Sequence, residues 1–106
     1  MAFKVIGTDT YNEEINRWDK ADKDVAEKLP KKLAENPFLG KPLSFPFLRE
    51  QKIREKRAYY LIYEDLELVL LVAVSGKKDQ QSTINHIKAQ FVEFRKIAEE
   101  IAKRVS

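Results

Sequence analysis

Apolar residues recur at regular intervals along most of the chain, and these intervals predict its helices and strands. Near the C-terminus they step by three and four positions, which predicts one long amphipathic helix over 82–105. Its apolar stripe consists of Ile84, Ile87, Phe91, Phe94, Ala98, Ile101 and Val105. Such a helix would be about 36 Å long at a rise of 1.5 Å per residue. Because it would overhang a small domain, we expect part of the stripe to pack on a neighbour, for which a homodimer through this helix is one option.

The first part of the chain predicts a short strand, two helices and a connector. Residues 3–6 form the strand, and a first helix follows it. The second helix ends just before Pro37, because the residue preceding a proline disfavours helix. Its apolar positions are Val25, Leu29 and Leu33. Residues 37–48 contain three prolines and several large apolar side chains, so we expect a connector that packs on the core.

Three strands are predicted in the middle of the chain. Residues 52–57 alternate in character, 58–63 are aromatic and β-branched, and 66–74 are almost wholly apolar. An apolar strand of that kind is buried on both faces, so 66–74 should be central. Together the elements predict a single α+β domain over 1–106. We expect the order β-α-α-β-β-β-α, with a mostly antiparallel four-stranded sheet, a helical pair and a long C-terminal helix.

Composition excludes several kinds of chemistry. The chain has no cysteine and one histidine, so we expect no disulfide, no thiolate zinc site, no other metal and no cofactor. The longest apolar run, Leu68 to Val74, is far shorter than the roughly 20 residues of a membrane span. We therefore expect a cytoplasmic protein that does not contact the membrane.

Basic residues alternate along the predicted strand over 52–57. Lys52, Arg54 and Lys56 should project from one face of it, because side chains on a strand alternate between faces. Their charges would stand about 7 Å apart, which is close to the phosphate spacing of a nucleic acid strand. The other interpretation is a solvated edge strand whose lysines discourage aggregation.

Further candidates lie on either side of the buried strand. Tyr60, on the neighbouring strand, could stack on an unpaired base, and the alternative is packing in the core. Lys77 and Lys78 follow the buried strand after a glycine and could close the same site as RNA-binding cations. His86 lies off the apolar stripe of the last helix, so we expect it at the surface.

Three stretches carry a resemblance to a known family. Residues 36–43 read NPFLGKPL, 52–54 read KIR and are followed by YYLIY at 59–63, and 69–78 form a buried strand that ends in a basic pair. In this order the chain resembles the RelE/ParE toxin superfamily of prokaryotic toxin–antitoxin pairs. The resemblance implies a microbial-RNase-like fold and a ribosome-dependent mRNA endonuclease that inhibits translation. It also implies an acidic antitoxin, encoded by an adjacent gene, that binds the toxin and holds it inactive. The apolar stripe from Ile84 to Val105 could serve either self-association or docking of this antitoxin.

The resemblance also implies roles for individual residues. Lys52 matches the family's base and Arg54 its second basic residue, while Lys78 matches an arginine that stabilises the transition state or donates a proton. The reaction is a metal-independent attack of the ribose 2′-OH on the adjacent phosphate. Two positions differ: Tyr60 stands where the family has an arginine, and Ile84 where many active members have a tyrosine. RNA binding is therefore expected before turnover.

Two other functions remain open at this level. One is a ParE-like toxin without nuclease chemistry, which binds a protein target such as a topoisomerase. The other is a diverged interaction domain of the same fold.

Overall fold

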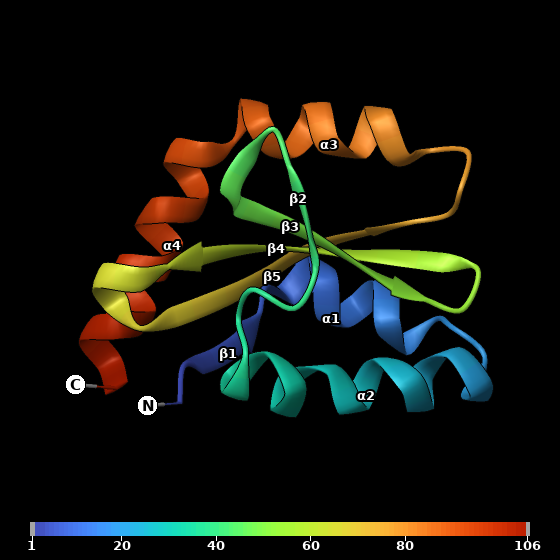
Figure 1. Cartoon of the computed structure of the whole chain (residues 1–106), viewed down its shortest axis with the longest axis horizontal. Helices are drawn as coiled ribbons and strands as arrows, with labels where there is room; N and C mark the ends of the chain where they lie inside the picture. Colours follow the sequence, from blue (N-terminus) through green and yellow to red (C-terminus); the bar gives the residue numbers. More distant parts are fainter. Residues whose placement is uncertain (1, 106) are drawn as a thin grey trace.

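The computed structural model describes residues 2–105, which form a sheet covered by helices on both faces (Figure 1). The strands of this part of the chain are β1 (Lys4–Gly7), β2 (Lys41–Leu43), β3 (Phe45–Ile53), β4 (Lys56–Tyr63) and β5 (Leu68–Ser75). Its helices are α1 (Asp9–Asn16), α2 (Lys20–Glu35), α3 (Gln80–Ala89) and α4 (Phe91–Val105), with a short 3-10 helix over Glu64–Leu66.

The strands lie in the order β1-β5-β4-β3-β2. β1 runs parallel to β5 and the other neighbours are antiparallel, so the predicted α+β fold with a mostly antiparallel sheet is confirmed. β5 lies between β1 and β4 and is largely buried, as its apolar sequence predicted. Within residues 2–105 the sheet has five strands rather than the predicted four. The extra pairing comes from the predicted connector, which forms β2 and the first part of β3.

The two faces of the sheet have separate cores. On one face, α1 and α2 supply Tyr11, Ala26, Leu29 and Leu33, which pack against apolar residues of the sheet such as Val69. On the other face, α3 and α4 cover the sheet (Figure 1). The apolar residues packed between them and the strands are Leu48, Tyr59, Leu61, Leu70, Val72, Ile84, Ile87 and Phe94.

The predicted continuous helix over 82–105 is divided into α3 and α4 at Gln90, where φ is −116° and ψ is 19°. The longest dimension of the molecule is 35 Å, so one straight helix would have extended along its whole length. The bend instead folds both halves of the stripe onto the chain's own sheet, and Ile87 and Ala98 are fully buried. Most of the stripe is thus not free for the expected homodimer. No helix in residues 2–105 is both long and apolar enough to cross a membrane.

Candidate functional site

The row of cations expected on a single strand does not form. β3 ends at Ile53, the chain reverses through Arg54 and Glu55, and β4 begins at Lys56. Arg54 has a φ of 58°, the left-handed conformation that tight turns require. The prediction of one strand over 52–57 is therefore wrong, and Lys52 lies on a different strand from Lys56.

Two of the three cations bind a buried carboxylate on the α2 side of the sheet. Arg54 Nε lies 2.9 Å from Asp22 Oδ1, and Lys56 Nζ donates to Asp22 Oδ2. The Asp22 side chain is only 8% exposed. Lys56 Nζ also lies 5.3 Å from the centre of the Trp18 ring. Arg54 and Lys56 thus attach the β3–β4 turn to α2. They do not form a row with Lys52.

Lys52 lies on the opposite face, beside a cation that the sequence did not single out. In the antiparallel ladder Lys52 is paired with Arg57, and Arg57 is paired with Ser75 on β5. Directly paired residues project from the same face, about 5 Å apart. Glu50 and Lys52 are two positions apart on β3, so their side chains project from the same face. Because Glu50 is bonded to Gln80 of α3, this is the face that α3 covers.

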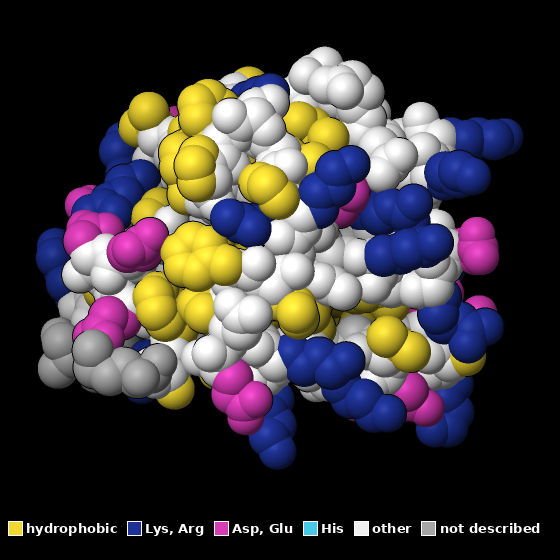
Figure 2. Space-filling model, viewed as in Figure 1, with side chains coloured by type: hydrophobic (Ala, Val, Ile, Leu, Met, Phe, Trp, Pro, Cys, Tyr) yellow, Lys and Arg dark blue, Asp and Glu magenta, His cyan; other side chains and the backbone are white. Residues whose placement is uncertain are grey.

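Lys77 and Lys78 extend the positive charge at this end of the sheet. Both are exposed and follow Ser75 by two and three positions, in the loop between β5 and α3. We call Lys52, Arg57, Lys77 and Lys78 the basic end of the sheet. Figure 2 shows Lys and Arg side chains gathered at the end of the molecule where the β3–β4 turn and the β5–α3 loop lie.

A carboxylate and two hydroxyl groups lie beside the basic end. Glu50 Oε1 accepts a hydrogen bond of 2.9 Å from Gln80 Nε2 and lies 4.0 Å from Arg57 Nε. Next to them the hydroxyls of Tyr59 and Ser75 are 2.7 Å apart. Burial raises the pKa of Tyr59, although the hydrogen bond with Ser75 acts in the opposite direction. The Tyr59 phenol is therefore a neutral hydrogen-bonding group at physiological pH.

Tyr60 has no exposed surface, so the prediction that it provides a stacking platform for a base is wrong. Its hydroxyl donates to the carbonyl of Pro37 at 2.8 Å and accepts from the backbone N–H of Gly40 at 2.9 Å. Burial raises the pKa of Tyr60 as well. The alternative of core packing is the correct one, and Tyr60 anchors the loop before β2. Ile84 is also buried, as its place in the stripe predicted.

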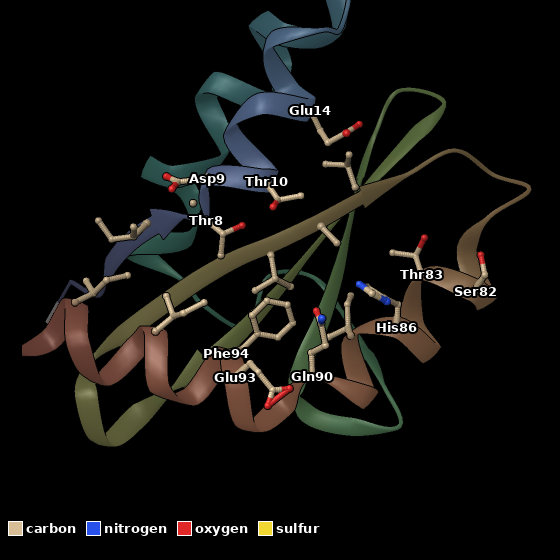
Figure 3. Close-up of a pocket in the computed structure, with 18 residues that line it drawn as sticks. Thr8, Asp9, Thr10, Glu14, Ser82, Thr83, His86, Gln90, Glu93 and Phe94 are labelled. Carbon is tan, nitrogen blue, oxygen red and sulfur yellow. The ribbon is translucent and has the colours of Figure 1, made fainter.

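A large groove lies elsewhere, between α1, β5 and the two C-terminal helices (Figure 3). Its volume is about 1030 Å³, and it contains none of the predicted site residues. Its charged lining is acidic, with Asp9, Glu14 and Glu93, while the exposed His86 also borders it. Such a lining repels phosphate, so the groove does not fit the ligand expected from the sequence. Among residues 2–105, no group of three or more potential metal ligands is found.

Sequence reasoning missed Arg57, Glu50 and Gln80 because their neighbourhood depends on strand register. Once the turn is placed at Arg54 and Glu55, Lys52 and Arg57 become directly paired. The only available signal was the charge of Arg57. The sequence pattern placed this residue at the end of the predicted strand over 52–57, whereas it lies near the start of β4.

Comparison with solved structures gives the fold a name. The chain is similar to a mutant of the E. coli toxin RelE in its free state, with a TM-score of 0.71 and 16% identity over 84% of this chain and 98% of that one. It is also similar to the RelBE2 toxin–antitoxin complex of Mycobacterium tuberculosis, with a TM-score of 0.64 and 17% identity over 73% and 100% of the two chains. For the intact E. coli RelBE complex the values are 0.62 and 16%, over 72% and 96%.

No protein-family model and no curated protein matches the sequence. The likeness to the solved structures nevertheless shows that the chain has the RelE toxin fold. The resemblance inferred from its sequence is thereby confirmed at the level of the fold.

Proposed function

We propose that the chain is the toxin of a toxin–antitoxin pair and that it cuts messenger RNA on the ribosome, in the cytoplasm. The RelE fold supports this, since two solved structures that share the fold are toxin–antitoxin complexes. The basic end is the observation that supports RNA as the ligand. There Lys52 and Arg57 share one face of the sheet, and Lys77 and Lys78 follow the neighbouring strand β5. Clustered cations bind the phosphates of nucleic acids through charge.

The chemistry requires a proton acceptor, a proton donor and fixed positive charge. The ribose 2′-oxygen forms a bond to the adjacent phosphorus while the bond from phosphorus to the 5′-oxygen breaks. The products are a 2′,3′-cyclic phosphate and a 5′-hydroxyl, and no metal or cofactor is needed. In our proposal Lys52 and Arg57 stabilise the charge that develops on the phosphate, and Lys78 protonates the 5′-oxygen.

Glu50 adds a second candidate for the base. The family resemblance assigns that role to Lys52, but a lysine must first lose its own proton before it can accept another. An ionised carboxylate accepts the 2′-OH proton directly, and Glu50 lies beside Arg57, 4.0 Å away. We therefore propose that Glu50 receives the proton and that Lys52 holds the phosphate.

Cleavage can be tested in a ribosome-containing translation extract by mapping the ends of a defined message. The purified chain should cut the message, and Lys52→Ala, Arg57→Ala and Glu50→Gln should each slow cleavage on the order of 100-fold. Lys96→Ala is the matched control: Lys96 is exposed on α4, which lies at the other end of the molecule from the β3–β4 turn (Figure 1), so its rate should stay within about threefold.

Two outcomes would contradict the proposal at different levels. An intact message and continued translation would exclude the nuclease. Cleavage that Lys52→Ala and Arg57→Ala leave unchanged would exclude the basic end as its site.

A ParE-like toxin without nuclease chemistry is the second candidate. It is favoured by the burial of Tyr60 and by the binding of Arg54 and Lys56 to Asp22, which together leave a smaller basic surface than the sequence suggested. Inhibition of a purified topoisomerase, with the message left intact, would select this function.

A further inference from the structure

Three phenylalanine rings contact one another at the surface, far along β3 from the basic end. The ring centres of Phe45 and Phe47 are 5.1 Å apart, and each lies 5.5 Å from the centre of Phe91. Phe45 is 39% exposed and Phe47 38%. We call these three residues the aromatic surface; Val92, the residue after Phe91, is 64% exposed. Figure 2 shows hydrophobic side chains gathered in the region where the β2–β3 turn lies beside the junction of α3 and α4.

Backbone contacts hold the aromatic surface in place. The Arg49 side chain donates to the carbonyl of Pro46 at 2.8 Å, to that of Gly40 at 2.9 Å and to that of Phe38 at 3.2 Å. It thereby ties the start of β3 to the loop before β2, which Tyr60 also anchors. A surface fixed in this way loses little conformational entropy when a partner covers it. Solvent alone gives no reason to present three aromatic rings together.

Two cations lie against the aromatic residues at this edge. Lys88 Nζ binds Ser44 Oγ at 2.8 Å and lies 5.9 Å from the centre of the Phe45 ring. The Arg49 guanidinium lies 5.1 Å from the centre of the Phe38 ring, which is 41% exposed. In a symmetric pair of copies the same patch faces itself, so these cations would approach their own copies and repel. Acidic groups on a partner would instead be attracted.

The geometry also favours a helix over a strand or an RNA base as the partner. β2 is an edge strand of three residues that contains Pro42, which has no N–H to offer to an added strand. A base needs an open ring face for stacking. Here Phe45 and Phe47 stack on each other, and Phe91 packs edge-on against both.

We propose that the aromatic surface is the docking site for an acidic amphipathic helix of the antitoxin. Apolar side chains of that helix cover the three rings, and its carboxylates meet Lys88 and Arg49. The inference rests on the proposed function, since it assigns the partner of the same toxin to a particular surface. Phe47 and Lys52 are five residues apart on β3, which is about 17 Å along a strand. A helix docked on the rings can therefore reach towards the basic end.

The test uses the proteins encoded by the two genes that flank this one, each purified and titrated against the whole chain. We expect one of them, with acidic character, to bind. The double variant Phe45→Ser with Phe47→Ser should weaken binding more than about 10-fold, and Lys88→Glu by about 3-fold to 10-fold. Val25→Ser is the matched control, because Val25 is 37% exposed on α2, and its affinity should stay within about twofold. Circular dichroism verifies that each variant is folded.

Each result supports or overturns a specific statement. Unchanged binding by a folded Phe45→Ser and Phe47→Ser variant overturns the docking site while the toxin–antitoxin pair stands. If neither flanking protein binds the unmodified chain, the toxin–antitoxin function fails, and the docking site with it. Concentration-dependent dimerisation that the double variant abolishes would assign the surface to a second copy. Loss of binding to a single-stranded oligouridylate in this variant, but not in Lys52→Ala, would assign it to RNA.

Discussion

Asp22 determines which basic residues in the middle of the chain remain free. It lies on α2 with 8% of its side chain exposed, and it receives one bond from Arg54 and another from Lys56. Its own backbone N–H donates to Asp19, the residue that caps the helix. The Asp22 carboxylate thus holds the β3–β4 turn and two cations against α2, close to the cap that Asp19 provides at the start of the helix.

Replacement of this carboxylate should destabilise the fold. Asp22→Ala leaves Lys56, which is only 34% exposed, without its acceptor, whereas Arg54 at 57% can turn to water. We expect the free energy of unfolding to fall by about 1–3 kcal/mol, measured by urea denaturation. Asp24→Ala removes an exposed partner of Lys20 instead and should change it by no more than about 0.5 kcal/mol. Equal effects of the two substitutions would show that the buried network contributes nothing.

At the scale of elements, sequence patterns predicted most strands and helices but not the points where they turn. The apolar periodicity placed α2, β4 and β5 well, because long regular patterns define a face. The β3–β4 turn was missed because Arg54 takes a left-handed conformation that is usual for glycine or asparagine. Without such a signal, the alternating residues around it resemble one strand.

The break between α3 and α4 was hidden for a similar reason. Gln90 is neither glycine nor proline, and the steps of three and four continue across it, so the stripe shows no interruption. The same limitation applied to the site. Lys77 and Lys78 follow the buried strand as expected. Lys52, however, lies near the end of β3 instead of beginning a strand, and Arg57 and Glu50 join it only through a register that the turn decides.

The turn between β4 and β5 allows a test of backbone strain. Glu67 ends the 3-10 helix with a φ of 50°. A side chain in this left-handed conformation destabilises the folded chain by about 1–2 kcal/mol. Glycine avoids this strain, but it raises the conformational entropy of the unfolded chain, which offsets part of the gain. Glu67→Gly should therefore raise the free energy of unfolding by about 0.5–1 kcal/mol. Glu27→Gly, at an exposed position in the middle of α2, should lower it by about 1 kcal/mol, and a loss of stability in both variants would contradict this explanation.

At the scale of the whole molecule, a small net charge of +3 is unevenly distributed. Four cations form the basic end, while the groove between α1 and α4 is acidic. A ligand with repeated negative charges should therefore bind at one end of the molecule only.

The salt dependence of RNA binding measures this distribution. If the four cations of the basic end each contact a phosphate, the logarithm of affinity for single-stranded RNA should fall with the logarithm of salt at a slope of at most about −3. Lys77→Ala should make the slope shallower by about 0.7. Titration by fluorescence anisotropy at several salt concentrations gives both values. A slope near zero would indicate that the interaction does not depend on phosphate contacts.

The parallel pairing of β1 with β5 has a consequence for how the chain is made. Lys4 pairs with Leu68, so β1 leaves the ribosome well before β5 and stays unpaired until β5 has emerged. The β3–β4 hairpin, by contrast, closes between near neighbours. Contacts so distant in sequence form late in folding. A nascent chain would therefore carry Lys52 and Arg57 side by side before Ser75 and the lysines after it arrive, and the complete basic end would assemble only once β5 and the loop after it have emerged.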